Sequence, residues 1–256
     1  MLTMTDGRTG RAVPLSPAHR RPLRVCAQLP EGEDGAGATA ARVLVLTDVL
    51  MRTVESGGGQ VDWVCETADP APEHHRRLRS LTDALGVRPP SAFTGPGEAT
   101  ALLGGPPDVR VLADGTRDGD QGLWLETGTV RRPNAPEPPL DADPLPLRLA
   151  LLSLPYRSPL TLPPLALTEA ERALREWRRA VADWARAPSK PVPDAFRSAA
   201  ATALADDLDT PAVVALLRRA ETSDDLPNGA KFETFALLDH YLGLELTREI
   251  GRWTGP

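Results

Sequence analysis

The feature that most constrains the fold is a short apolar stretch within residues 143–160, which read DPLPLRLALLSLPYRSPL. Residues 147–154 are apolar apart from Arg148 and Ser153, and Pro159 follows the turn that closes the run. This pattern predicts a short buried helix. Strand-like and helix-like patterns alternate before the stretch, whereas helical patterns dominate after it. We therefore expect it to be the hinge between an α/β half and an all-α half.

A strand, helix, strand pattern defines the first half. Residues 23–29 (LRVCAQL) and 61–66 (VDWVCE) have the length and alternation of strands, and residues 39–55 between them have the apolar spacing of a helix. Such a unit makes a right-handed crossover between parallel strands. We expect a reduced Rossmann-like domain with a parallel sheet over residues 23–142, preceded by a flexible tail over residues 1–22.

Amphipathic helices are predicted throughout the second half. Apolar side chains recur at spacings of three and four over residues 170–184, which places them on one face of a helix. Thr168 and Glu171 have the spacing of a capping box, which predicts the start of that helix. Similar patterns follow, joined by short loops. The sequence predicts a helical-bundle domain over residues 143–253.

Three aspartates precede one of these helices, at Asp206, Asp207 and Asp209. A Mg²⁺ site is one interpretation of such a cluster. The simpler interpretation is a helix end followed by a new N-terminal cap, because Pro211 fits the first turn of a helix that Asp209 or Thr210 caps.

Composition limits the classes of partner. The chain has 256 residues, a formal net charge of −6 and two cysteines. This acidic balance disfavours tRNA and argues against DNA, because phosphate binding needs clustered Lys and Arg. The cysteine count argues against a disulfide framework. Because the sequence has no apolar run long enough to cross a bilayer and no signal-peptide pattern, we expect a cytoplasmic protein without a membrane partner.

A glycine-rich segment, EGEDGAGA, covers residues 31–38 between the first predicted strand and its helix. Free backbone N–H groups and the helix dipole make such a loop a candidate anion site. Gly35 and Gly37 are the candidate nucleotide-binding glycines. Their spacing fits neither G-x-G-x-x-G nor a P-loop, and no lysine closes the segment, so a plain connection is the alternative.

Several segments, in the same order, resemble cysteinyl-tRNA synthetases and the related cysteine ligase of the mycothiol pathway. They are ARVLVLTDVLMR at 41–52, LRLALLS at 147–153, YRSPL at 156–160 and ALADDLDTPA at 203–212. The resemblance implies a class I synthetase nucleotide fold joined to a helical domain. In that family the nucleotide fold activates cysteine with ATP.

This chain departs from the family at its signature motifs. The positions that should read His-Ile-Gly-His are residues 37–40, which read GATA, and residues 128–134 contain no lysine where a KMSKS loop is expected. Alanine and glycine side chains cannot stabilise the charge that develops on ATP during adenylate formation. We therefore expect a non-catalytic protein with a binding or regulatory role, no cofactor and a protein partner.

Cys26 lies near the position of the first zinc-ligand cysteine of the family, which makes it the candidate metal ligand. Zinc requires three or four protein ligands. Cys65, His74 and His75 are candidate substitutes for the missing family ligands, and two buried thiols in a Rossmann-like core are the alternative.

The enzymatic alternative is a synthetase-like ligase that activates cysteine or another carboxylate. Its nucleotide-binding residues would be Gly35, Gly37, Thr39 and Arg42, with Arg131 as a further phosphate ligand. ATP and zinc would be its cofactors.

Overall fold

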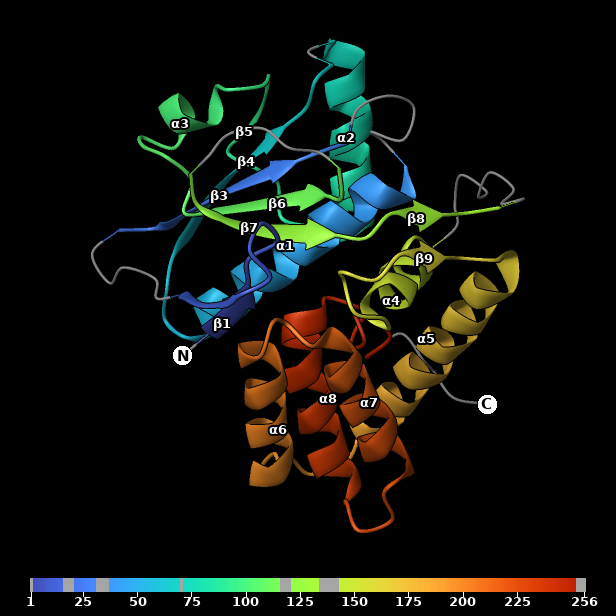
Figure 1. The fold of residues 1–256 in the computed structure, drawn as a ribbon. Coiled ribbons are helices and arrows are strands. Elements are labelled where there is room, and N and C mark those ends of the chain that lie inside the picture. Colours follow the sequence, from blue (N-terminus) through green and yellow to red (C-terminus); the bar gives the residue numbers. More distant parts are fainter. Residues whose placement is uncertain are drawn as a thin grey trace.

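The computed structural model describes residues 2–15, 21–30, 37–69, 71–115, 121–133 and 143–251. Within these residues an α/β half stands above a group of packed helices (Figure 1). The expected fold class, a Rossmann-like parallel sheet followed by a helical bundle, is confirmed.

Five parallel strands form the central sheet. Their order across the sheet is β5 (Ala92–Thr94), β4 (Val61–Glu66), β3 (Leu23–Gln28), β6 (Val109–Ala113) and β7 (Leu123–Thr127). The chain builds outward from β3 to β5, then returns past β3 to place β6 on its other side. The boundary between β3 and β6 is therefore a topological switch point, where doubly wound folds bind ligands at the carboxyl ends of their strands.

Helices cover the two faces of the sheet unequally. Helix α1 (Ala38–Ser56) crosses one face and contacts β3, β4, β6 and β7, and α2 (Pro72–Ala84) packs beside it. The short helix α3 (Ala99–Leu102) lies on the opposite face, where Ala99 and Leu103 pack against Cys26 and Val64. Long crossover helices thus protect only the α1 face within the described residues.

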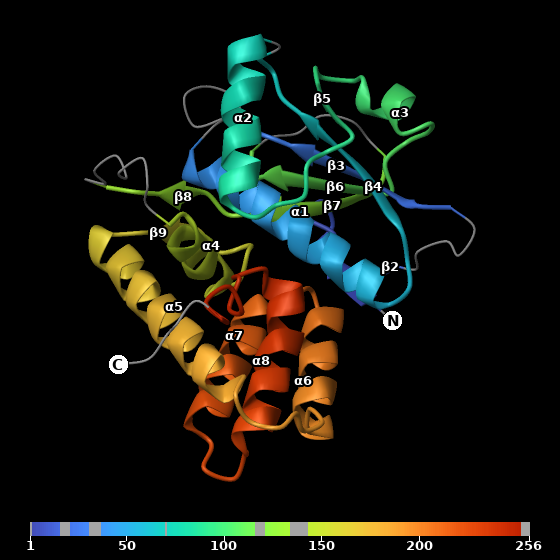
Figure 2. The ribbon, with the colours of Figure 1, turned by 180° about the vertical axis from the view of Figure 1, so that it is seen from behind.

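Helix α1 is buried on all sides over most of its length, from Thr39 to Met51. It contacts β3 and β6 above, and α4 (Leu145–Leu152) and α8 (Asn228–Leu242) below. Both views place it between the sheet and the helices (Figures 1 and 2). A helix apolar all round is typical of such a central position.

The expectation of a flexible tail over residues 1–22 is wrong for its first part. Strands β1 (Leu2–Thr5) and β2 (Ala12–Leu15) form an antiparallel hairpin, and the Met4 side chain is completely buried. The hairpin reaches both halves, because Gly7 N donates to Trp124 O at 2.8 Å and Thr5 N donates to Asp207 Oδ1 at 2.8 Å.

The hinge contains the predicted helix as α4, flanked by two short paired strands, β8 (Val130–Arg131) and β9 (Leu160–Thr161). Arg148 of α4 is fully buried. Its guanidinium donates to Asp48 of α1, to Leu85 O at 2.9 Å and to Leu242 O at 2.6 Å. One side chain thus connects α1, α4 and the ends of α2 and α8.

The helices after the hinge are α5 (Pro164–Trp184), α6 (Asp194–Ala205), α7 (Thr210–Thr222) and α8. The capping-box prediction is wrong, because α5 begins at Pro164 and the Thr168 hydroxyl donates to Pro164 O inside the helix. The prediction of a cap at Asp209 is confirmed, since its Oδ1 accepts from Ala212 N at 3.0 Å. None of the described helices has the length and apolar character needed to span a membrane.

Candidate functional site

The face of the sheet opposite α1 carries a row of polar side chains. Because side chains alternate along a strand, Cys26 and Gln28 of β3 point away from α1. The strand register places Glu66 beside Gln28 and Arg110 beside Cys26. We call the group formed by Cys26, Gln28, Glu66 and Arg110 the polar cluster.

Glu66, the last residue of β4, is the centre of the polar cluster. Its Oε2 accepts hydrogen bonds from Gln28 Nε2 at 2.7 Å and from the Cys26 thiol at 3.4 Å, and Arg110 Nη1 lies 3.5 Å away. Its Oε1 accepts from Gly97 N at 2.5 Å. The carboxylate therefore joins three strands and the connection that precedes α3.

Several buried polar atoms on this face have no hydrogen-bond partner within the described part of the chain. They are Gln28 Oε1, Arg110 Nε and Trp124 Nε1, on residues that are 5%, 8% and 4% exposed. An unpaired buried polar atom costs about 1–3 kcal/mol. Three such atoms on one face, from neighbouring strands, offer one acceptor and two donors to a bound molecule.

The polar cluster lies close to the switch point. Gln28 and Glu66 are the final residues of β3 and β4, and Gln28 is opposite Leu112 of β6. Carboxyl ends of parallel strands next to a switch point are the usual ligand position in such folds. The strand order and the unpaired polar atoms therefore both indicate a ligand site at the polar cluster.

Cys26, the candidate metal ligand, belongs to this cluster but lacks a zinc-like environment. A guanidinium, Arg110 Nη1, lies 3.8 Å from its sulfur. Burial and the Glu66 charge raise the pKa of the thiol, whereas a zinc ligand must be a thiolate. Among the described residues no three His, Cys, Asp or Glu side chains are grouped to hold a metal. The residues around Cys26 therefore do not fit zinc.

The proposed substitute ligands lie elsewhere. Cys65 points to the α1 face, opposite to Cys26, and both cysteines are buried and free. On α2, His74 Nε2 is 3.1 Å from Thr67 Oγ1, and the His75 ring stacks on Phe93. The alternative prediction, two buried thiols in a Rossmann-like core, is confirmed.

Arg42 and Thr39, two of the candidate nucleotide-binding residues, contact the hinge, the segment just before β8, or β8 itself. Arg42 donates to the backbone oxygens of Gly128, Pro155 and Ser158 at 3.2, 2.7 and 2.6 Å. Burial lowers the pKa of Arg42 to about 10. The Thr39 hydroxyl accepts from Val130 N at 3.1 Å. Arg42 therefore fastens α1 to the hinge, and Thr39 fastens α1 to β8, which flanks the hinge.

The remaining candidates are the loop glycines and Arg131. Gly37 is the N-cap residue of α1, and Gly35 lies outside the described residues. Arg131 is exposed on β8. The structure thus brings Gly37, Thr39 and Arg42 together at the start of α1, whereas Cys26 lies on the other face of the sheet.

Sequence reasoning missed Gln28, Glu66 and Arg110. A signal was present, because Gln28 is the second-last residue of one predicted strand and Glu66 ends the other, and equivalent ends of parallel strands lie side by side. Arg110 gave a weaker signal, since the register that places it beside Cys26 depends on the order of strands across the sheet.

Comparison with known proteins leaves the chain without an assigned family: no protein-family model matches it, and no curated protein matches it significantly.

Proposed function

We propose that this chain is a non-catalytic, synthetase-like binding protein and that the polar cluster is its binding site. The observation that carries the proposal is the use made of Arg42. At the start of α1, where the resemblance places the ATP-binding signature, the Arg42 guanidinium donates to two backbone oxygens of the hinge and to Gly128 O. A cation that fixes two halves together cannot also move to follow a phosphate during a reaction.

The polar cluster supports a binding role because it combines order with unused hydrogen-bonding capacity. Glu66 is held by four neighbours, so the site is preorganised before a ligand arrives. Among the described residues, Gln28 Oε1 and Arg110 Nε have no hydrogen-bond partner, so the first can accept a hydrogen bond from a ligand and the second can donate one. The nearby charges of Glu66 and Arg110 compensate each other. A compact ligand with both a donor and an acceptor, and little net charge, fits this arrangement.

The second candidate is the ATP-dependent ligase that activates cysteine or another carboxylate. The strand order favours it, because a switch point between β3 and β6 is typical of nucleotide-binding sheets. This candidate needs phosphate ligands other than Thr39 and Arg42.

Two measurements test the proposal. Pyrophosphate exchange with ATP and each amino acid in turn is expected to stay at background, and robust exchange with any of them would establish the ligase instead. Thermal-shift screening with small amides and zwitterions is expected to find compounds that stabilise the protein.

Two variants test whether a ligand found in this way binds at the polar cluster. Gln28→Leu removes the free acceptor and is expected to abolish the ligand-induced shift. Gln60→Leu makes the same chemical change at an exposed position before β4 and should leave the shift unchanged. Equal shifts in both variants would place the binding site away from the polar cluster.

A further inference from the structure

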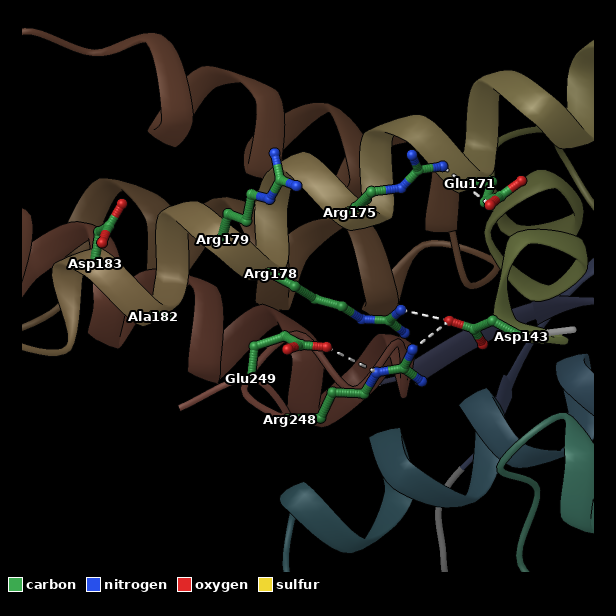
Figure 3. Close-up of a pocket in the computed structure, with 9 residues that line it drawn as sticks. All are labelled: Asp143, Glu171, Arg175, Arg178, Arg179, Ala182, Asp183, Arg248 and Glu249. Carbon is green, nitrogen blue, oxygen red and sulfur yellow. Dashed lines mark hydrogen bonds and ion pairs between the residues drawn. The ribbon is translucent and has the colours of Figure 1, made fainter. Parts of the chain in front are cut away.

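A pocket of about 360 Å³ lies on the helical half, between α5 and the segment that follows α8 (Figure 3). Its charged lining comes from Asp143, Glu171, Arg175, Arg178, Arg179, Asp183, Arg248 and Glu249. The pocket is separate from the polar cluster, which lies on the sheet. Its volume is within the range of small-ligand sites, about 300–1,000 Å³.

One side of the pocket is held rigidly by Asp143. The Asp143 carboxylate accepts from Arg178 of α5 and, at 2.7 Å, from Arg248 Nη2, and both contacts are drawn in Figure 3. Burial alone would raise the pKa of Asp143, but the Arg178 hydrogen bond and the neighbouring charges lower it, so the carboxyl group is ionised at neutral pH. Arg178 also donates to Leu244 O and Glu245 O. These contacts leave Arg178 and Arg248 little capacity for a ligand.

The α5 side of the pocket holds the available donors. Arg175 and Arg179 are one helical turn apart and exposed, and Figure 3 shows both guanidinium groups rising from the same helix. Arg175 Nη2 donates to Glu171 at 3.0 Å. The Arg179 side chain has no hydrogen-bond or ion-pair partner within the described residues. Like charges at this spacing repel each other, so a shared anion would relieve the repulsion.

We propose that this pocket binds a phosphate group, with Arg175 and Arg179 as its ligands. The planar guanidinium fork matches the oxygens of phosphate, and two forks one turn apart can hold different oxygens of one group. Four carboxylates formally balance the four arginines of the lining. Selection therefore rests on the geometry of the Arg175 and Arg179 guanidinium groups, and the affinity is modest and falls with ionic strength.

Isothermal titration calorimetry of the 256-residue protein with inorganic phosphate and with pyrophosphate, at low ionic strength, tests this site. The wild-type protein is expected to bind with one-site saturation, and pyrophosphate is expected to bind more tightly than phosphate because it carries more negative charge and more acceptor oxygens. Arg179→Gln is expected to weaken binding by about tenfold or more, the loss of one charge-assisted contact.

Two further variants make the test specific. Arg172→Gln removes an α5 charge that lies two helical turns from Arg179 and outside the lining of this pocket, so the affinity of this variant should stay within about twofold of wild type, apart from general screening. Glu171→Gln releases Arg175 from its ion pair and is expected to tighten binding.

Absence of saturable binding to either anion would overturn the proposal, as would equal losses in the Arg179→Gln and Arg172→Gln proteins. Weaker binding in the Glu171→Gln protein would also contradict it. Because none of these residues touches the polar cluster, the outcome is independent of the function proposed for that site.

Discussion

The two faces of the central sheet are built for different purposes. The face against α1 is apolar, with Val25, Val111 and Leu125 completely buried. The opposite face carries Gln28, Glu66 and Arg110 instead, beneath the single turn of α3 and its flanking loops. Parallel sheets usually bury apolar side chains on both faces. The comparison indicates that apolar packing on the α1 face stabilises the fold. The polar face has less apolar packing and more hydrogen-bonding groups.

The apolar face gains further support from the far side of α1. Asp48 lies on the side of α1 that meets the helical half, where Arg148 and Arg52 both contact its carboxylate. Helix α1 is therefore held on one side by apolar packing against the sheet and on the other by the ion pairs of Asp48. Substitutions on this side should cost far more stability than substitutions in the polar cluster.

The largest effect is expected from Asp48→Asn. The change leaves the Arg148 guanidinium buried without its counter-charge, which costs about 4 kcal/mol in the free energy of unfolding. Urea denaturation followed by circular dichroism measures the loss. Asp83→Asn, at an exposed position on α2, is the matched control and should stay within about 0.5 kcal/mol of wild type. A loss below about 1 kcal/mol at Asp48 would mean that water reaches Arg148 and that the joint is open.

A smaller but still large effect is expected from Leu125→Ala on the apolar face. Removing this buried side chain leaves a cavity against α1 and costs about 3 kcal/mol in the free energy of unfolding. Leu102→Ala makes the same change at a residue that is 52% exposed, so it should cost much less. Equal losses would show that the apolar face is no better packed than the surface of α3.

The sequence predicted the strands and helices of both faces better than it predicted the roles of their side chains. Alternation in residues 23–29 and 61–66 identified β3 and β4, and α1 was expected within a residue of its observed start. The hairpin of β1 and β2 was missed because its strands have four residues each and include Pro14, so the alternation signal is short. Strand pairing across the chain, rather than local pattern, stabilises such elements.

Candidate residues were harder to predict because their roles depend on which face they occupy. Thr39 and Arg42 follow a glycine-rich segment, a pattern that favours phosphate binding, but α1 is turned so that Arg42 contacts the hinge and Thr39 contacts Val130 of β8. Cys26 and Cys65 occupy similar strands, yet Ala27, not Cys26, is opposite Cys65. That offset of one residue places the thiols on opposite faces and removes any shared metal site.

On the polar face, Gln28→Leu should change the free energy of unfolding by less than about 1 kcal/mol. The variant loses the hydrogen bond to Glu66 but also removes an unpaired buried oxygen and adds apolar surface, so the contributions oppose each other. Urea denaturation provides the measurement, beside the Leu125→Ala protein. A loss as large as that of Leu125→Ala would mean that the polar cluster is part of the stabilising core.

The smallest effect, and the most direct comparison of the two faces, is expected from thiol labelling. Burial raises the pKa of both Cys26 and Cys65, so both remain protonated at pH 8, and thiolate-specific reagents should react slowly with the folded protein. Labelling then requires local opening. Cys65→Ser leaves the Cys26 thiol, covered by α3, and Cys26→Ser leaves the Cys65 thiol, covered by α1. Because separating α3 exposes less apolar surface than separating α1, Cys26 should be labelled faster than Cys65 in native conditions and at the same rate in denaturant. Faster labelling of Cys65 would contradict this expectation, because it would show that the α1 face opens more readily than the face covered by α3.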